Sequence, residues 1–358
     1  MSESELEQLT QSAVTLLQQL IKTPSFSREE NQTAALLQAY LERAKQTVHR
    51  QGNNVWVFSK DYHPERPTLL LNSHHDTVRP TASWTLDPFS PVMRQDKVYG
   101  LGSNDAGGAL VALLHTFLYL DALPDRLYNL LFAATAEEEV SGANGIASIV
   151  DVCGPVALGI VGEPTEMQMA VAEKGLMVLD CEARGLSGHA ARHEGVNAIY
   201  AAMQDIVWIR EFHFPEKSDL LGEVSTCVTQ IAAGTQHNVV PDRCTFVVDV
   251  RTNELYTNEQ VLRIIDHNTV SRVTPRSLRL NSSSIALDHP LVQRGTALGL
   301  AHYGSPTLSD QALLNGFPTL KLGPGKSERS HTADEYIKVK EIKHGIATYC
   351  RLLEGLAL

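Results

Sequence analysis

The order of two kinds of strand-like segment limits what this chain can fold into. The first kind is almost entirely apolar, as expected of strands buried on both faces of a sheet, and comprises residues 54–59, 67–73, 127–135, 156–164 and 317–325. Segments with apolar residues at helical spacing stand between them, at 4–22, 31–44, 107–120 and 289–303. This alternation predicts an α/β domain with a mixed sheet sandwiched by helices, and it leaves the Pro-rich residues 83–105 as a loop.

The second kind of segment alternates apolar and polar residues, at 176–185, 224–234 and 244–251. Such alternation is typical of antiparallel strands with one exposed face. Two helical stretches, 196–212 and 258–271, lie among these strands. We therefore expect a discontinuous α/β domain, residues 1–174 and 284–358, interrupted by an α+β domain of residues 175–283.

Composition narrows the class of partner. The 358 residues carry a formal net charge of −11 with no run rich in Lys or Arg, so neither nucleic acid nor an anionic membrane is an expected partner. No apolar run approaches the length of a membrane span, and the acidic, amphipathic N-terminal segment does not resemble a signal peptide. The five cysteines are scattered and form no CxxC pair, which argues against a disulfide framework and against a thiolate metal site. We expect a cytoplasmic protein.

Polar residues able to do chemistry follow the apolar runs directly. Because open α/β sheets bind ligands at the carboxyl ends of their strands, these residues are candidates for one site. They are His74 and Asp76 in "NSHHDTV", Asp105 in "GLGSNDAGG", Glu137, Glu138 and Glu139 in "TAEEEV", Glu163 in "VGEPT" and His331 in "SERSHTADEY". A simpler interpretation exists for most of them: a polar strand end at His74 and Asp76, a helix N-cap at Asn104 or Asp105, and a capping box at Thr135-x-x-Glu138.

Taken together, the candidates form a set of metal ligands. Two histidines and three or four carboxylates, without a thiolate, suit Zn²⁺, Co²⁺ or Mn²⁺. Five or six ligands exceed the four that one tetrahedral ion takes, so two ions bridged by a carboxylate fit better. A glutamate beside the ligands is then free to act as a base.

The order and spacing of the motifs resemble the acetylornithine deacetylase / succinyl-diaminopimelate desuccinylase family of two-metal amidohydrolases and peptidases. The resemblance runs over nearly the whole chain and is carried by "SHHDTV", "WTLDPFSP…VYGLGSND", "TAEEEVSG", "VGEPT", "GLSGHAARHEGVNAI", "NVVPDRCTFVVDVR", "LGPG" and "SHTADEYI". It implies hydrolysis of a linear amide with two divalent metal ions per chain, Zn²⁺ first and Co²⁺ as the alternative. It also implies that the inserted domain is a lid with a four-stranded antiparallel sheet, through which the chain forms a homodimer.

The resemblance implies a role for each site residue. His74 and Glu163 would complete one metal site, Glu139 and His331 the other, and Asp105 would bridge both, followed by a cis peptide bond. Glu138 would be the general base, Asp76 would support His74, and His189 would reach the partner's active site as an oxyanion donor. The substrate would be held by Asn238, by Arg251 through its α-carboxylate, and by Gly323 through its N–H group or a close approach.

The chain departs from the family pattern near the bridging aspartate. "GLGSNDAGG" lacks the Arg and the Lys that many members have there, and Ser141 and His193 stand where Gly and Pro are usual. No departure touches an expected ligand, but together they leave the substrate open. The expected substrate is an Nα-acyl amino acid of arginine biosynthesis, N-acetylornithine or an acyl-citrulline, and the alternatives are succinyl-diaminopimelate and a dipeptide.

Other functional classes fit less well. A metal-binding protein without catalysis would lack the base Glu138, which is present. "GLGSND" does not match the dinucleotide-binding pattern GxGxxG, and "GLSGH" fails the serine-hydrolase pattern GxSxG at its last position.

Overall fold

In the computed structural model, which describes residues 1–124, 126–192 and 194–358, the chain divides into two compact units. The first comprises Met1–Val171, Ile285–Tyr303 and Ser309–Leu358, and the second comprises Ala172–Ser284 and Gly304–Leu308. The boundaries expected from the sequence were 174/175 and 283/284. His193, one of the departures noted above, lies outside the described residues.

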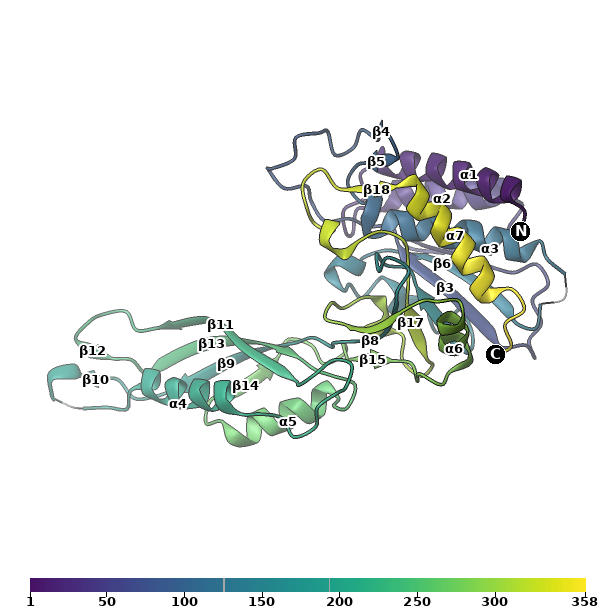
Figure 1. Cartoon of the computed structure of the whole chain (residues 1–358). Coiled ribbons are helices and arrows are strands. Elements are labelled where there is room, and N and C mark those ends of the chain that lie inside the picture. Colours follow the sequence, from purple (N-terminus) through teal and green to yellow (C-terminus); the bar gives the residue numbers. More distant parts are fainter. Residues whose placement is uncertain (125, 193) are drawn as a thin grey trace. The chain divides into compact units, whose positions relative to one another are not determined.

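A large mixed sheet is the framework on which the candidate residues are arranged (Figure 1). Its strands follow the order β1-β2-β6-β3-β7-β17-β8-β15, with β16 beside β8. Strands β6, β3, β7 and β17 are parallel neighbours, so their carboxyl ends meet at one edge. All residues of these strands are buried, which explains why their sequences are continuous apolar runs. The bounds are β1 Val48–Gln51, β2 Asn54–Phe58, β3 Thr68–His74, β6 Asn129–Thr135, β7 Leu158–Val161, β8 Met169–Glu173, β15 Ser283–Ser284, β16 His302–Ser305 and β17 Thr319–Lys321.

Different elements cover the two faces of this sheet. A Cβ built on Gly162 would meet Ala109 and Leu113 of α3, whereas a Cβ on Gly159 would meet Leu314 and Phe317, which follow the short 3₁₀ helix η5. Helices α1, α3 and α7 pack against one another, and α3 lies on β3 and β6 (Figure 1). The helices of this unit are α1 Glu3–Ile21, α2 Asn31–Arg43, α3 Gly108–Asp121, α6 Pro290–Ala297 and α7 Val339–Leu353, with η5 at Asp310–Leu313.

The segment expected to be a loop, residues 83–105, contains two short strands, so that expectation was wrong in part. β4 (Val92–Arg94) and β5 (Lys97–Tyr99) form a hairpin, and β18 (Tyr336–Lys338) pairs with β5. Strands of three residues are too short to show a period-2 pattern, and the partner β18 lies far along the chain. This pairing brings the segment after His331 beside the segment that leads to Asp105.

The second unit has the α+β organisation that its sequence predicts. Among its described residues, four antiparallel strands follow the order β11-β13-β9-β14, and two helices pack on the apolar side of the strands. Burial alternates along β9 and β13, as their sequences indicate. Strand β11 differs, because none of its residues is buried, and the expected half-buried pattern is therefore wrong there. The elements are β9 Met177–Arg184, β10 Gly188–His189, α4 Ala198–Glu211, β11 Ser225–Ala233, β12 Val239–Val240, β13 Arg243–Arg251, α5 Asn258–Asn268 and β14 Arg272–Pro275.

None of the helices in the described part of the chain combines the length and the apolar character needed to span a membrane.

Candidate metal centre

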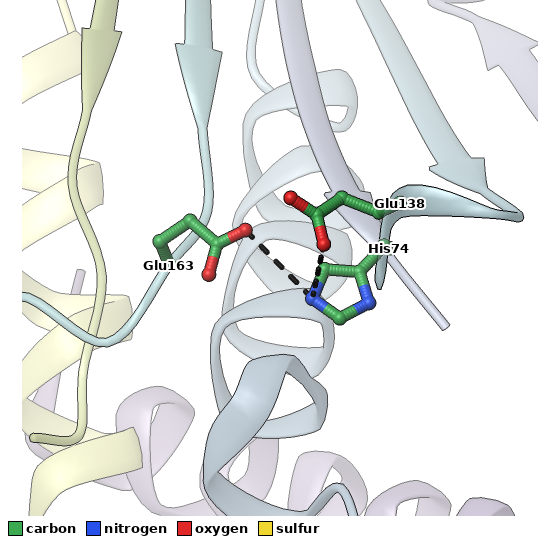
Figure 2. A group of neighbouring side chains, drawn as sticks. All are labelled: His74, Glu138 and Glu163. Carbon is green, nitrogen blue, oxygen red and sulfur yellow. Dashed lines mark ion pairs between the residues drawn. The ribbon is translucent and has the colours of Figure 1, made fainter. Parts of the chain in front are cut away.

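His74 is the last residue of β3, and its side chain is 1% exposed. Its Nδ1 atom lies 3.0 Å from the backbone oxygen and 3.3 Å from Oδ1 of Asp76. Because both partners are acceptors, Nδ1 carries a hydrogen atom, and Nε2 is the atom that the ring offers to a ligand. Nε2 lies 3.3 Å from Oδ1 of Asp105, 3.7 Å from Oε1 of Glu163 and 3.9 Å from Oε2 of Glu138. Figure 2 shows the last two carboxylates converging on this atom.

A second histidine, from a distant part of the chain, faces Asp105 from its other side together with Glu139. Nε2 of His331 lies 2.9 Å from Oε2 of Glu139 and 3.6 Å from Oδ2 of Asp105. The two oxygens of Asp105 therefore face different histidines, one each, as a bridging carboxylate requires. The peptide bond between Asp105 and Ala106 is cis, as expected from the resemblance.

Ligand atoms come close enough together to hold ions in two overlapping groups among the described residues. One consists of His74, Glu138 and Glu163, and the other of His74, Asp105 and Glu139. Glu138 thus lies within reach of an ion, although the resemblance makes it a base. His331 belongs to neither group, but its contacts with Asp105 and Glu139 place it at the edge of the second.

Asp76 holds the two glutamates in place. Its side chain is buried, and it accepts hydrogen bonds from the backbone N–H groups of Glu138 at 3.1 Å and Glu139 at 3.2 Å. The hydroxyl of Ser27 donates to Oδ2 of Asp76 at 2.7 Å. Asp76 therefore fixes both the ring of His74 and the short helix η2 (Glu138–Val140) that begins after β6.

The simpler interpretations of these motifs do not hold. Neither Asn104 nor Asp105 caps α3, whose N-cap is Gly107 without a side-chain hydrogen bond. Thr135 does not form a capping box; its hydroxyl donates to Oδ2 of Asp310 at 2.8 Å.

The first glutamate of "EEE" turns away from the other two. Glu137 has a φ of 56°, and its Oε1 accepts a hydrogen bond from Nδ2 of Asn144 at 2.9 Å. Its backbone N–H donates to the buried Glu30 at 3.2 Å. The repulsion that three adjacent carboxylates would produce is thereby reduced to that between Glu138 and Glu139.

Several residues around the centre were not found from the sequence. Ser27, Glu30, Asp310 and Glu335 all bind a segment that carries a candidate ligand or the base, and three of them are buried carboxylates. Their partners are mostly backbone N–H groups or hydroxyls far away in sequence, and such pairings leave no periodic pattern. Only Glu335 stands in a motif that the resemblance quoted, "SHTADEYI".

Four of the buried carboxyl groups hold their protons more firmly than usual, whereas the neighbouring histidines keep the pKa values of Asp76 and Asp105 low. Burial raises the pKa of Glu138 well above its ordinary value and that of Glu163 to about 8. Burial likewise raises the pKa of Asp310 to about 6 and that of Glu335 to about 8. The cluster contains more negative charge than its histidines can neutralise.

The carboxylates around the two histidines raise the pKa values of both imidazole rings. Burial alone would lower the pKa of His74, but hydrogen bonds with the carboxylates of Asp105 and Asp76 raise it well above 6.5. The hydrogen bond with Glu139 raises the pKa of His331 to about 9. In the metal-free protein, the carboxylates therefore favour the protonated form of both rings.

This donor set fits two divalent metal ions. It provides imidazole nitrogens with an oriented hydrogen, carboxylate oxygens, and a shared aspartate between two histidines, which is a mixture that Zn²⁺ and similar ions accept. The excess of carboxylates that have raised pKa values gives the same indication, because cations would remove their mutual repulsion.

The expected substrate-binding residues are divided between the units. Gly323 lies in the first unit, where its N–H group donates to Oγ1 of Thr165 at 3.0 Å, so the N–H is already in use. A Cβ at Gly323 would lie 2.4 Å from the backbone oxygen of Glu163, so close approach is the reason for glycine here. His189, Asn238 and Arg251 lie in the second unit, away in sequence from every candidate ligand.

Local contacts define how these three residues are arranged. His189 and Asn238 are exposed, and they lie in or beside the β10–β12 pair. Nε and Nη2 of Arg251 donate to the two carboxylate oxygens of Asp249 at 2.8 and 3.1 Å. A substrate carboxylate would have to compete with Asp249 for this guanidinium.

The loop that departs from the family pattern is closely packed at the two positions concerned. Leu101, which replaces the usual Arg, is 5% exposed. A Cβ at Gly107, which replaces the usual Lys, would lie 2.4 Å from the backbone oxygen of Gly102 and 2.7 Å from Cδ1 of Leu17. The two departures therefore accompany a tightly packed loop around Asp105.

This chain is similar to known proteins over most of its length. The profile of the family described as "Peptidase family M20/M25/M40" matches residues 70–355. The acetylornithine deacetylase of Pectobacterium carotovorum is 30% identical over 307 residues, which cover 77% of this chain and 76% of the relative. The succinyl-diaminopimelate desuccinylase of Blochmanniella pennsylvanica is 26% identical over 96% of this chain and 98% of its own.

Solved structures share the fold at lower identity. Aminopeptidase PepT from Bacillus cereus has a TM-score of 0.78 at 19% identity, covering 96% of this chain and 98% of its own. A dinuclear metal-binding peptidase of the M20 family from Bacillus subtilis has a TM-score of 0.76 at 14% identity, covering 97% and 98%. From the family profile and the relatives, we conclude that the chain belongs to peptidase family M20/M25/M40 and is a metal-dependent amide hydrolase.

Proposed function

We propose that this protein hydrolyses the amide bond of an Nα-acyl amino acid of arginine biosynthesis, N-acetylornithine or an N-acyl-citrulline, to the free amino acid and a carboxylate. The observation that carries the proposal is the position of Glu138. Its carboxylate lies 3.9 Å from Nε2 of His74, is held there by a backbone hydrogen bond to Asp76, and has a pKa that burial raises. A carboxyl group of this kind can accept and return a proton near neutral pH.

The residues fall into two groups around the ions in this proposal. His74 and Glu163 would hold one ion, Glu139 and His331 would hold the other, and Asp105 would contribute a carboxylate to both. The ions, Zn²⁺ with Co²⁺ as the alternative, would polarise the substrate carbonyl and lower the pKa of a water molecule. The support from the structure is the pairing of each Asp105 oxygen with a different histidine.

The chain's own groups move the proton. Glu138 accepts a proton from the water whose oxygen bonds to the amide carbon. It then donates that proton to the leaving nitrogen as the C–N bond breaks, which yields the amine and the carboxylic acid. The acid passes its remaining proton to the amine, so the products are a carboxylate and an ammonium group. His189, contributed by the lid of a partner subunit, donates a hydrogen bond to the developing oxyanion, which is worth about 10²–10³ in turnover.

The substrate class rests on the relatives and on one cationic residue. Arg251 offers a planar fork that can bind an α-carboxylate. Asn238 would also contact the substrate, and so would Gly323, whose backbone closely approaches Glu163. Relatives named acetylornithine deacetylase support the arginine-pathway substrate. Relatives named succinyl-diaminopimelate desuccinylase support the second candidate, and a dipeptide is the third. We further propose a cytoplasmic homodimer that assembles through the second unit.

Metal content and a substrate panel test this function. Protein purified without chelator is analysed for metal per chain. It is then assayed for amine release from acetylornithine, acetylcitrulline, their succinyl analogues, succinyl-diaminopimelate and dipeptides. We expect activity on an arginine-pathway substrate that chelator abolishes and Zn²⁺ or Co²⁺ restores. Metal-dependent activity confined to succinyl-diaminopimelate or dipeptides would contradict the proposed substrate but would still agree with metal-dependent amide hydrolysis.

The role of Glu138 has a separate test. Glu138→Ala should give folded protein that binds metal and turns over at least about 10²- to 10⁴-fold more slowly, because the proton acceptor is lost. Circular dichroism and metal analysis establish folding and loading. Wild-type turnover in this variant would show that another group accepts the proton.

A further inference from the structure

Two buried side chains, Asn104 and Glu335, hold the segment around Asp105 against the segment that carries His331. We propose that they are positioning residues, which keep Asp105 and His331 at the separation at which both can bind one ion. They thereby set the affinity for the ion that His331 helps to bind. This inference rests on the ligand set of the proposed function, and adds two residues that are not ligands themselves.

Glu335 accepts hydrogen bonds from the backbone of the loop that leads into Asp105. Its side chain is buried, and Oε1 accepts hydrogen bonds from the N–H groups of Asn104 at 2.7 Å and Asp105 at 2.9 Å. Oε2 accepts from the N–H group of Gly102 at 3.0 Å. The backbone oxygen of Glu335 also accepts from the N–H group of Gly100 at 3.0 Å. Four hydrogen bonds to one residue therefore fix the path of this loop.

Asn104 forms hydrogen bonds that connect the same loop to the segment preceding His331. Its side chain is fully buried and pairs with the backbone of Lys326: Oδ1 accepts from the N–H group and Nδ2 donates to the oxygen, both at 3.0 Å. Nδ2 also lies 3.5 Å from Oγ of Ser330. A Cβ at Gly325 would lie 2.5 Å from Oδ1 of Asn104, so this close approach requires a glycine.

His331 depends on such support because packing does not hold its ring. The side chain is 55% exposed, and its ring contacts are carboxylates, Glu139 at 2.9 Å and Asp105 at 3.6 Å. An ion that replaces these contacts needs its ligands within roughly 0.5 Å of their final positions before it binds. The backbone on both sides of the site has to supply that precision. Asn104 and Glu335 join the two sides next to Asp105 itself, beyond the pairing of β5 with β18.

The test measures Co²⁺ binding to the metal-free, full-length protein by titration calorimetry and visible absorption. His331→Ala identifies the binding step that belongs to the ion in question. We expect Asn104→Ala and Glu335→Gln to weaken that step by about 10- to 100-fold and the other step by less, because Asp105 is a proposed ligand of both ions whereas His331 is a ligand of one. Gln replaces an acceptor oxygen of Glu335 by an NH₂ group that faces backbone N–H groups.

Matched controls separate positioning from general stability. Asn129 is equally buried and pairs in the same way with the backbone of His63 and Arg66, at the other end of the parallel strands. Asp205 is a buried carboxylate that accepts from the N–H groups of Val270 and Ser271 in the second unit. Asn129→Ala and Asp205→Asn should lower the melting temperature and leave both Co²⁺ affinities unchanged.

The outcomes distinguish this inference from the proposed function. Wild-type affinities in both test variants would overturn the inference, as would an equal loss in the two controls. If Glu335→Gln does not fold, Asn104→Ala decides alone. Wild-type protein that binds fewer than two Co²⁺ ions would instead overturn the ligand set itself, before any substitution is made.

Discussion

Removal of the Asp76 carboxylate should destabilise the metal-free protein strongly. The side chain is buried and accepts from the N–H groups of Glu138 at 3.1 Å and Glu139 at 3.2 Å. Asp76→Ala would leave both donors without a partner in the protein. Each orphaned buried donor costs about 1–3 kcal/mol, so the free energy of unfolding should fall by about 2–6 kcal/mol.

Two further variants separate the contributions to this loss in the free energy of unfolding. Asp76→Asn keeps one acceptor oxygen and should lose about 1–3 kcal/mol, half of the effect. Ser27→Ala is the matched control, because it removes only the hydroxyl that donates to Oδ2 of Asp76 and leaves both backbone hydrogen bonds in place. It should cost about 1 kcal/mol.

Urea unfolding of the metal-free proteins at pH 7 measures these differences, with a Co²⁺ titration beside it. Because Asp76 orients the ring of His74, Asp76→Ala should also weaken Co²⁺ binding by about 10- to 100-fold. The reasoning would be refuted if Asp76→Ala lost no more stability than Ser27→Ala. In that case the hydrogen bonds to Glu138 and Glu139 would contribute nothing.

The remaining predictions concern pH, a glycine and the substrate. In the metal-free protein, the hydrogen bond with Glu139 raises the pKa of His331 to about 9 and burial raises that of Glu163 to about 8. Protonation of His331 stabilises the folded protein fully below pH 6.5, and this stabilisation is lost as the pH rises through about 9. Glu163 becomes a buried anion as the pH rises through about 8. Urea unfolding should therefore show falling stability of the metal-free protein from pH 6.5 to 9, and a rise would contradict these protonation states. Gly323→Ala should displace Glu163 and destabilise the protein by about 1–3 kcal/mol, more than Gly159→Ala, where the nearest atom to a Cβ would be a side-chain methyl group 3.1 Å away. Arg251→Ala should raise KM by about 10- to 100-fold with little change in kcat if the guanidinium binds the substrate carboxylate, and an unchanged KM would remove Arg251 from the substrate site.

The sequence was sufficient for the parts of the fold and site that repeat a simple pattern. Residues 67–73 and 127–135 are continuously apolar because β3 and β6 are buried on both faces, and this could be read directly. His74 and Glu138 could be brought together in advance for a related reason. Parallel strands end at a common edge, so the polar residues that follow each strand had to meet there.

The parts that could not be predicted depend on contacts between distant segments. Glu335 is a buried carboxylate, but its partners are N–H groups of residues 102–105, and nothing local to either segment indicates the other. Strand β5 has three residues and becomes a strand only through its pairing with β4 and β18. The alternation in residues 224–234 indicated a strand correctly, but its burial depends on which neighbours cover it, and β11 has none of its residues buried.

The position of His331 in the chain has a consequence for how the enzyme is made. His74, Asp105, Glu139 and Glu163 all leave the ribosome before the whole second unit, whereas His331 follows it. At about 5–20 residues per second, roughly 170 residues of further synthesis separate Glu163 from His331, which takes about 10–30 s. During that interval the nascent chain presents an open set of carboxylates and one histidine. With His331 among the ligands, as proposed, the complete centre can form only after the inserted unit has been synthesised, so translation would delay the moment at which this hydrolase becomes active.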